Sequence, residues 1–152
     1  MGKSITDALN PCPKCGRYIN RPAVVDGIIL NKDYEILLIK RGRDPFKGEY
    51  AIPGGFIDWN ETAKEAVVRE VKEETNLEVE VVDFLNYYDS IKRDKKRRTI
   101  SLVFICRITG DINNVKAGDD AAEHGWFKVD NLPELAFDHE KIINDFKKYR
   151  RL

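Results

Sequence analysis

Residues 62–75 show an apolar stripe with the period of an α-helix. At about 100° per residue, the apolar positions that share one side are Ala63, Ala66, Val67 and Val71. Glu70 and Glu74 fall within this stripe, and Glu73 lies at its margin. Buried unpaired carboxylates are costly, and like charges three or four residues apart repel. The pattern therefore predicts an amphipathic helix with a cation bound along its acidic edge.

The flanks of this segment predict where the helix starts and ends. Thr62, followed three residues later by Glu65, is typical of a capping box. Asn76 tolerates the left-handed conformation in which helices commonly stop. Before the helix, residues 53–55 read Pro-Gly-Gly, a backbone that can turn sharply and approach a ligand closely. We expect carbonyl oxygens of this corner to join the carboxylates around the cation.

An all-oxygen ligand set of this kind favours Mg²⁺ or Mn²⁺ over zinc. These ions usually keep several waters and are shared with substrate phosphates. The alternative, from spacing alone, is a solvated acidic helix end, because most charge runs are solvated. The glycine corner and the placement of two glutamates inside the apolar stripe favour the metal site.

Aliphatic runs predict strands at residues 23–30 and 35–40, joined by a hairpin connection at 31–34. Because these runs are continuous, both faces of the strands should be covered. A short strand at residues 50–52 leads into the glycine corner. Further strands are expected at residues 77–88, 99–108 and 124–129.

The end of the chain predicts a second helix. Asp138 is a candidate N-cap, and Ile142, Ile143 and Phe146 recur on one face. Strands before and after a central helix, with a second helix at the end, predict an α+β fold in which a mixed β-sheet lies between helical layers. The length of 152 residues suits a single domain with a proper core.

Charge and composition narrow the class of protein. The 26 basic and 26 acidic residues balance, so no global field favours nucleic acid or acidic membranes. No apolar run approaches the roughly 18 residues of a membrane span, and the N-terminus lacks the apolar region of a signal peptide. An odd number of cysteines, three, agrees with a reducing compartment. We expect a soluble cytoplasmic protein without DNA or membrane partners.

A polar N-terminal segment, residues 1–20, precedes the domain expected at residues 21–152. It carries Cys12 and Cys15 in a Cys-Pro-Lys-Cys-Gly run, which is like one half of a zinc ribbon. No second half follows, since Cys106 lies in an apolar strand. A degenerate ribbon without metal, a zinc shared between two subunits, and a zinc completed by distant residues all stay open. We favour the degenerate ribbon over bound Zn²⁺.

Two basic segments are candidates for contact with anions. Arg41 and Arg43 follow a strand end that should face the glycine corner, and guanidinium groups bind phosphate bidentately; a solvated loop is the alternative. Residues 92–98 hold six basic residues in seven. We expect this hairpin tip to be mostly solvated, with attraction of an anionic substrate as the alternative.

These residues resemble the Nudix family. Its box reads G-x5-E-x7-R-E-U-x-E-E-x-G-U, where U is an aliphatic residue. The positions in register here are Gly55, Glu61, Arg69, Glu70, Val71, Glu73, Glu74 and Leu77. Asn76 stands where the family has glycine, and because asparagine also adopts the left-handed helix stop, the geometry should survive.

The resemblance implies an α/β/α sandwich and hydrolysis at phosphorus by a metal-activated water. The implied ligands of Mg²⁺ or Mn²⁺ are Glu70, Glu73, Glu74 and the Gly54 carbonyl. Arg69 would orient the carboxylates, and Glu61 would be a supporting acid. Gly55 and Glu61 are expected near the substrate, together with Arg41 and Arg43.

The general base is implied less directly, because Nudix enzymes often take it from outside the box. Glu123, which ends an acidic loop, matches a late glutamate that several family members keep. It is a candidate catalytic base or additional metal ligand. The alternative is an ordinary surface glutamate.

Runs at residues 43–48, 118–121 and 135–139 look like those of archaeal and bacterial ADP-ribose pyrophosphatases. This implies hydrolysis of ADP-ribose to AMP and ribose 5-phosphate by a homodimer. Competing substrates are NADH, a nucleoside triphosphate or a capped RNA end. A competing class is a non-catalytic Nudix domain that senses ADP-ribose; such domains commonly have eroded box glutamates, whereas all of them are present here.

Overall fold

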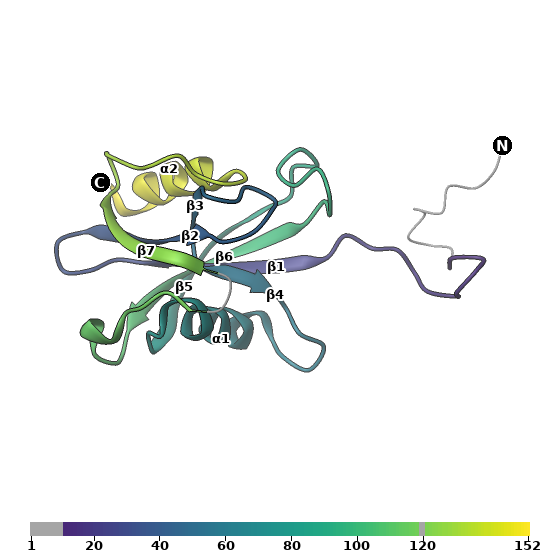
Figure 1. The fold of residues 1–152 in the computed structure, drawn as a ribbon, viewed down its shortest axis with the longest axis horizontal. Coiled ribbons are helices and arrows are strands. Elements are labelled where there is room, and N and C mark those ends of the chain that lie inside the picture. Colours follow the sequence, from purple (N-terminus) through teal and green to yellow (C-terminus); the bar gives the residue numbers. More distant parts are fainter. Residues whose placement is uncertain (1–10, 119–120) are drawn as a thin grey trace.

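The computed structural model describes residues 11–118 and 121–152. In chain order the elements are β1 (Ala23–Ile29), β2 (Glu35–Arg41), β3 (Tyr50–Ala51), β4 (Gly54–Phe56), α1 (Ala63–Thr75), β5 (Val79–Tyr88), β6 (Ile100–Ile108), the 3-10 turn η1 (Ile112–Asn114), β7 (Ala121–Lys128) and α2 (His139–Arg150). The strands lie between the helices, with α1 on one side and α2 on the other (Figure 1). This arrangement confirms the predicted α+β sandwich.

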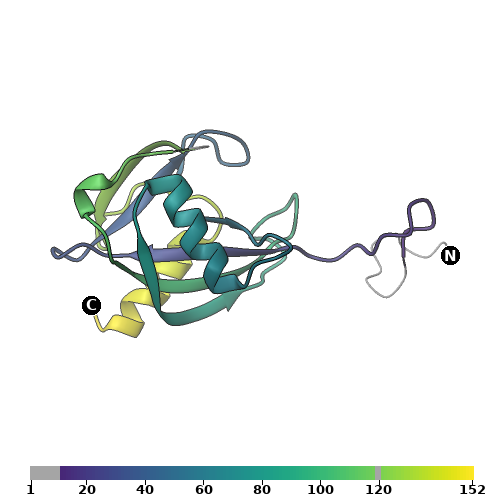
Figure 2. The same cartoon turned by 90° about the horizontal axis from the view of Figure 1, so that it is seen from below.

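The strands form two sheets. The larger has the order β4-β1-β6-β5 and is mixed, because β1 and β6 run parallel whereas the other neighbours run antiparallel. The smaller, β3-β2-β7, is antiparallel throughout. Figure 2 shows α1 lying across the strands of the larger sheet.

The hairpin predicted between the first two strands is present only at its turn. Within residues 31–34, the Tyr34 N–H donates to the Asn31 carbonyl at 3.1 Å, and a single bridge joins Leu30 to Ile36. Beyond that bridge β1 and β2 part and enter different sheets. The predicted connection at residues 31–34 is therefore confirmed, and beyond it each strand finds its partners elsewhere along the chain.

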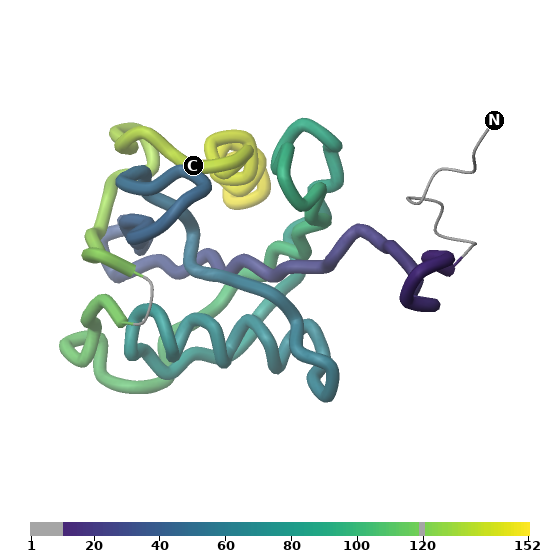
Figure 3. The backbone as a smooth tube through the Cα atoms, turned by 45° about the vertical axis from the view of Figure 1, so that its right-hand side comes forward, coloured from purple at the N-terminus to yellow at the C-terminus, as the bar shows by residue number. Residues whose placement is uncertain are grey.

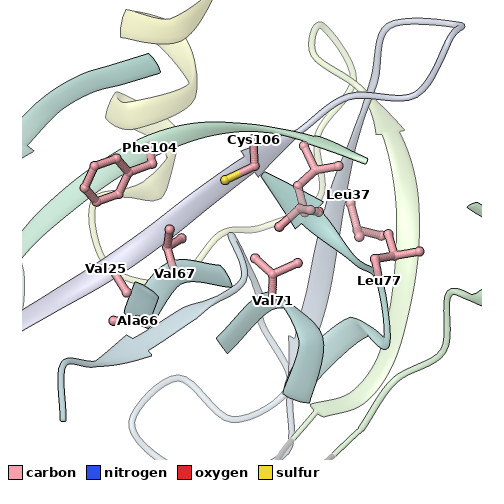
Figure 4. Close-up of a cluster of buried hydrophobic side chains, with 10 residues drawn as sticks. Val25, Leu37, Ala66, Val67, Val71, Leu77, Phe104 and Cys106 are labelled. Carbon is pink, nitrogen blue, oxygen red and sulfur yellow. The ribbon is translucent and has the colours of Figure 1, made fainter. Parts of the chain in front are cut away.

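Two hydrophobic cores explain the continuous aliphatic runs. Side chains alternate in a strand, so successive residues of β1, β2 and β6 enter opposite cores. The core under α1 holds Val25, Ile29, Leu37, Ala66, Val67, Val71, Leu77, Val79, Phe104 and Cys106 (Figure 4). The core under α2 holds Ile28, Ile36, Leu38, Ile52, Tyr88, Val103, Ile105, Ile142, Ile143 and Phe146. Both faces of these strands are covered, as predicted.

The limits of α1 agree closely with the sequence pattern. Thr62 and Glu65 form a reciprocal capping box, and Asn76 stops the helix at φ 61°, in the left-handed region. Its N–H donates to the Lys72 carbonyl at 2.9 Å. Asparagine thus performs the helix stop at the position where the Nudix box has glycine.

Asp138 occupies the N-cap position of α2, as predicted, but its side chain makes no capping hydrogen bond. The carboxylate instead accepts from the guanidinium of Arg93 at 3.1 Å. Neither α2 nor any other helix within residues 11–118 and 121–152 has the length and apolar character needed to cross a membrane.

We expect Phe146→Ala to destabilise the fold by about 3–5 kcal/mol, because it empties a fully buried site in the core under α2. The matched control is Lys148→Ala on the exposed face of the same helix, which should change stability by no more than about 0.5 kcal/mol. Urea denaturation of both variants measures the difference. Equal costs would contradict the assignment of this face to the core.

Candidate functional site

The acidic edge of α1 faces the short strand β4. β4 pairs antiparallel with β1, so that Asp26 lies opposite Gly54 and Val25 opposite Gly55. The Gly54 N–H donates to Glu74 Oε2 at 3.1 Å. The two glycines of the predicted corner therefore belong to a strand, and this strand connects the larger sheet to the helix.

The two glycines are needed for close approach. Neither has a left-handed φ. A Cβ at Gly54 would lie 2.0 Å from the Val25 carbonyl oxygen, and one at Gly55 would lie 2.4 Å from the Glu70 carboxyl carbon. Any side chain at either position would therefore displace β1 or Glu70, so the requirement for glycine is steric contact with the site, and not the sharp turn expected from sequence.

Arg69 donates hydrogen bonds to three carboxylates, and a fourth, that of Asp58, lies 3.6 Å from its Nε. Its Nε and Nη2 hold Glu61 Oε2 and Oε1 at 2.9 and 2.5 Å. Its Nη1 donates to Glu70 at 2.8 Å and to Glu73 at 3.1 Å, and Nη2 also reaches the Phe56 carbonyl at 3.0 Å. The hydrogen bond from Arg69 lowers the pKa of Glu61 to about 2. One guanidinium therefore fixes the direction in which this edge of α1 presents its charges.

The carboxylate of Glu74 has a different environment. Burial raises the pKa of Glu74 to about 8, with the Gly54 N–H opposing the shift and the charges of Glu70 and Asp26 adding to it. Burial also raises the pKa of Glu70, against the effect of Arg69. Both carboxylates would be stabilised as anions by a nearby cation.

Sequence reasoning missed two buried polar groups beside this edge. Asp26 accepts a hydrogen bond from the Ser101 hydroxyl, and burial raises its pKa to about 6. His139 accepts from the Ile52 N–H at Nδ1, 3.0 Å, and its Nε2 lies 3.8 Å from Asp26 Oδ1. Burial lowers the pKa of His139 to about 3, so this imidazole is neutral. A charged residue inside the aliphatic run at 23–30 was the signal that could have identified Asp26.

These groups line a cavity of about 470 Å³ that also holds much of the predicted site. Of the predicted residues, the cavity lining includes Arg41, Arg43, Gly54, Gly55, Glu70, Glu73 and Glu74. Glu61 and Arg69 lie outside the lining and act on it through the ion pairs described above. Acidic and basic side chains therefore meet around one hollow, as a metal-bound anionic substrate would require.

The basic tip predicted to be mostly solvated is partly built into the cavity wall. Arg93 is buried, binds Asp138 and donates from Nη1 to Thr99 Oγ1 at 2.6 Å. Asp94 is buried as well and accepts from the N–H groups of Lys96 and Arg97 at 3.1 and 3.0 Å. That turn brings Lys96 and Arg97 to the lining. The prediction of a solvated tip was wrong for Arg93, whose partner Asp138 is distant in sequence, and for Asp94, whose partners lie within the tip and at Thr99.

Aromatic rings complete the basic side of the cavity. The Arg41 guanidinium lies 5.1 Å from the ring centre of Phe137, and Arg97 lies 5.1 Å from that of Phe56. Phe46 packs edge-on against Phe137, with ring centres 4.7 Å apart. Cation–π contacts of this kind restrain long guanidinium side chains, so the charged groups that line the cavity are held near it.

Glu123 is not among the residues that line the cavity. It lies on β7 opposite Lys40 of β2, and its Oε1 is 2.7 Å from Lys40 Nζ. Cys12 and Cys15 also lie elsewhere, in the segment that precedes β1. The structure therefore brings together the acidic edge, the glycines and the two arginines, but not the candidate base or the cysteine pair.

A mixed sheet lies between two helices, and the acidic edge of α1 faces a cavity that is also lined by arginines. The chain belongs to the NUDIX family: the model of the NUDIX domain matches residues 20–146. The fold predicted from the resemblance is thereby confirmed.

Similar proteins include an ADP-ribose pyrophosphatase of Methanocaldococcus jannaschii, 52% identical over 133 residues, which cover 88% of this chain and 77% of that protein. An ADP-ribose pyrophosphatase of Streptococcus suis has a similar structure, with a TM-score of 0.72 and 26% identity over 88% of this chain and 94% of that one. A bifunctional NMN adenylyltransferase/ADP-ribose pyrophosphatase of Francisella tularensis, in complex with AMP and a manganese ion, has a TM-score of 0.73 and 27% identity over 86% of this chain and 42% of that one.

We expect Arg93→Met to destabilise the protein by about 3–5 kcal/mol, because it leaves the carboxylate of Asp138 without its partner at a largely buried position. Lys95→Met removes the same charge from an exposed position of the same tip and should cost no more than about 0.5 kcal/mol. Thermal unfolding of both variants measures the contrast. If the two variants unfold alike, Arg93 is not a structural anchor of the tip.

Proposed function

We propose that this chain is a Mg²⁺- or Mn²⁺-dependent hydrolase that cleaves the diphosphate of ADP-ribose to AMP and ribose 5-phosphate. The observation that carries the proposal is the meeting of Glu70, Glu73 and Glu74 with Arg41 and Arg43 around one cavity. The 52% identity to an ADP-ribose pyrophosphatase supports the choice of substrate. The manganese and AMP bound by the Francisella tularensis relative agree with a metal and a nucleotide at such a site.

The donor set fits a hard divalent cation. In the described residues, no three Cys, His, Asp or Glu side chains are close enough together to hold a metal ion as they stand. Glu70 and Glu73 instead accept hydrogen bonds from Arg69, and Glu74 accepts one from the Gly54 N–H. Burial raises the pKa of Glu74 despite the charge of Arg41, and a bound cation would favour the anionic form of this carboxylate. We assign Glu70, Glu73, Glu74 and the Gly54 carbonyl as the residues that would hold Mg²⁺ or Mn²⁺.

When bound, such an ion neutralises charge on the diphosphate oxygens and lowers the pKa of a coordinated water. Arg69 keeps the carboxylates oriented through its contacts with Glu61, Glu70 and Glu73. Arg41 and Arg43, on the loop side of the cavity, would contact phosphate oxygens. A side chain at position 55 would strike the Glu70 carboxylate. Gly55 therefore leaves room beside Glu70 for the phosphates of the substrate.

We retain Glu123 as the proposed general base. Its carboxylate is half exposed and paired with Lys40, so taking a proton from the attacking water requires it to exchange Lys40 for that water. No covalent intermediate is needed in such a reaction: the water oxygen bonds to phosphorus, the bridging P–O bond breaks, and the released phosphate takes the electron pair. The proposed setting is a homodimer in the cytoplasm.

The function is tested by product analysis with ADP-ribose, NADH, deoxynucleoside triphosphates and capped RNA side by side. We expect Mg²⁺-dependent release of AMP and ribose 5-phosphate from ADP-ribose at the highest kcat/KM. Glu73→Gln and Glu74→Gln should each lower this rate by at least about 100-fold while the circular dichroism spectrum is unchanged. Glu78→Gln, which alters an exposed glutamate just past the helix, is the matched control. Full activity in the first two variants would refute the site, and preference for another substrate would refute the substrate.

The role of Glu123 is tested against its ion-pair partner. We expect Glu123→Gln to lower kcat about 100-fold or more with little change in KM, because a lost base slows the chemical step. Lys40→Met breaks the same ion pair but leaves the carboxylate in place, so it should keep most of the rate. Equal losses in both variants would show that the pair is structural and that the base lies elsewhere.

A further inference from the structure

The segment before β1 forms an arm that leaves the body of the protein. Figures 1 and 2 show residues 11–22 extending from the first strand, and the tube in Figure 3 shows the tight turn at the far end of this arm. Tyr18 and Ile19 are exposed on it, at 58% and 39%. The cysteine pair is therefore carried on a projection, where a second molecule can reach it without meeting the helices or sheets.

The turn that holds the two cysteines has the backbone of a metal-binding knuckle. The Cys12 N–H donates to the Arg17 carbonyl at 2.7 Å, and the Gly16 N–H donates to the Cys12 carbonyl at 2.8 Å. Gly16 has φ 71°, a left-handed conformation that glycine adopts without strain. These contacts close a short loop in which both sulfur atoms come from the same turn, as in the first half of a tetrahedral Cys₄ site.

Two basic residues lie next to the cysteines in the sequence: Lys14 between them and Arg17 two residues after Cys15. A thiolate is the form of cysteine that binds metal. Positive charge so close along the chain favours negative charge on the sulfur atoms.

One chain cannot complete a tetrahedral site of sulfur and imidazole ligands here. Residues 1–10 contain neither cysteine nor histidine. Cys106 is buried in the core under α1, His139 is buried with Nδ1 bound to the Ile52 N–H, and His124 lies on β7, paired with β2. Within residues 11–118 and 121–152 no three potential ligands gather at one place. Two further thiolate ligands would therefore come from another molecule.

We propose that Cys12 and Cys15 from two copies of this chain bind one zinc ion between them through four thiolates. A second copy is the occupant because it brings an identical turn with two more thiolates, which gives the Cys₄ set that structural zinc sites use. The four flanking cations of the two turns offset the net negative charge of the zinc–thiolate cluster. The hydrogen bonds of this turn and the left-handed Gly16 support the shared zinc over the degenerate ribbon expected from the sequence. The inference does not rest on the proposed hydrolase activity.

The test measures zinc in the full-length protein, purified under reducing conditions and dialysed against zinc. We expect about one zinc per two chains and an X-ray absorption spectrum with sulfur neighbours at about 2.3 Å. Cys12→Ser/Cys15→Ser should lower the zinc content at least about tenfold. Lys14→Ala, which alters the same turn but keeps both thiols, is the matched control and should retain zinc.

A second measurement uses the unmodified chain. Adding a chelator should remove the zinc and expose two additional thiols per chain to a thiol reagent, because Cys106 stays buried. Three results would overturn the proposal: no zinc bound, zinc at one per chain, or zinc retained in the double variant. A disulfide between Cys12 and Cys15 in the reduced preparation would also overturn it.

Discussion

The site depends on the burial of several carboxylates near the contact between α1 and β4. Burial raises the pKa of Glu74, Glu70 and Asp26, so each of the three is less stable as an anion here than in water. A fold that only had to be stable would avoid this arrangement. The proposed divalent cation would offset this cost, because it would lie beside the carboxylates that burial destabilises as anions.

Arg69 holds part of this acidic cluster together. It satisfies Glu61 with two hydrogen bonds and shares its remaining donors between Glu70, Glu73 and the Phe56 carbonyl. Arg69 lies outside the cavity lining, so it holds these carboxylates from the side away from the cavity. Glu74 is left facing Gly54 at 3.1 Å. Arg69 therefore pairs directly with Glu61, Glu70 and Glu73, but not with Glu74.

The sequence predicted correctly those features that depend on residues close together in the chain. The capping box at Thr62, the left-handed stop at Asn76 and the acidic edge of α1 all follow from residues within one or two turns, and each is found as predicted. Arg93 was misjudged because its partner, Asp138, lies 45 residues further along the chain. The buried position of His139 was not predicted, since no periodicity reveals that it packs against Ile52 and Asp26. Local patterns predict elements, but such contacts arise only from the tertiary fold.

The parting of β1 and β2 is a further tertiary feature, and it shapes the site itself. A continuous hairpin would have placed the two strands side by side in one sheet. Instead they separate after the bridge between Leu30 and Ile36, and the cavity is lined from both sheets, by Asp26 and Gly54 of the larger one and by Ile39 and Ala51 of the smaller. Arg41 and Arg43, at and just beyond the end of β2, are thereby carried to the cavity that holds the acidic edge of α1. The feature least accessible to sequence reasoning, the divergence of two neighbouring strands, is the one that brings the cationic and anionic halves of the site to a common cavity.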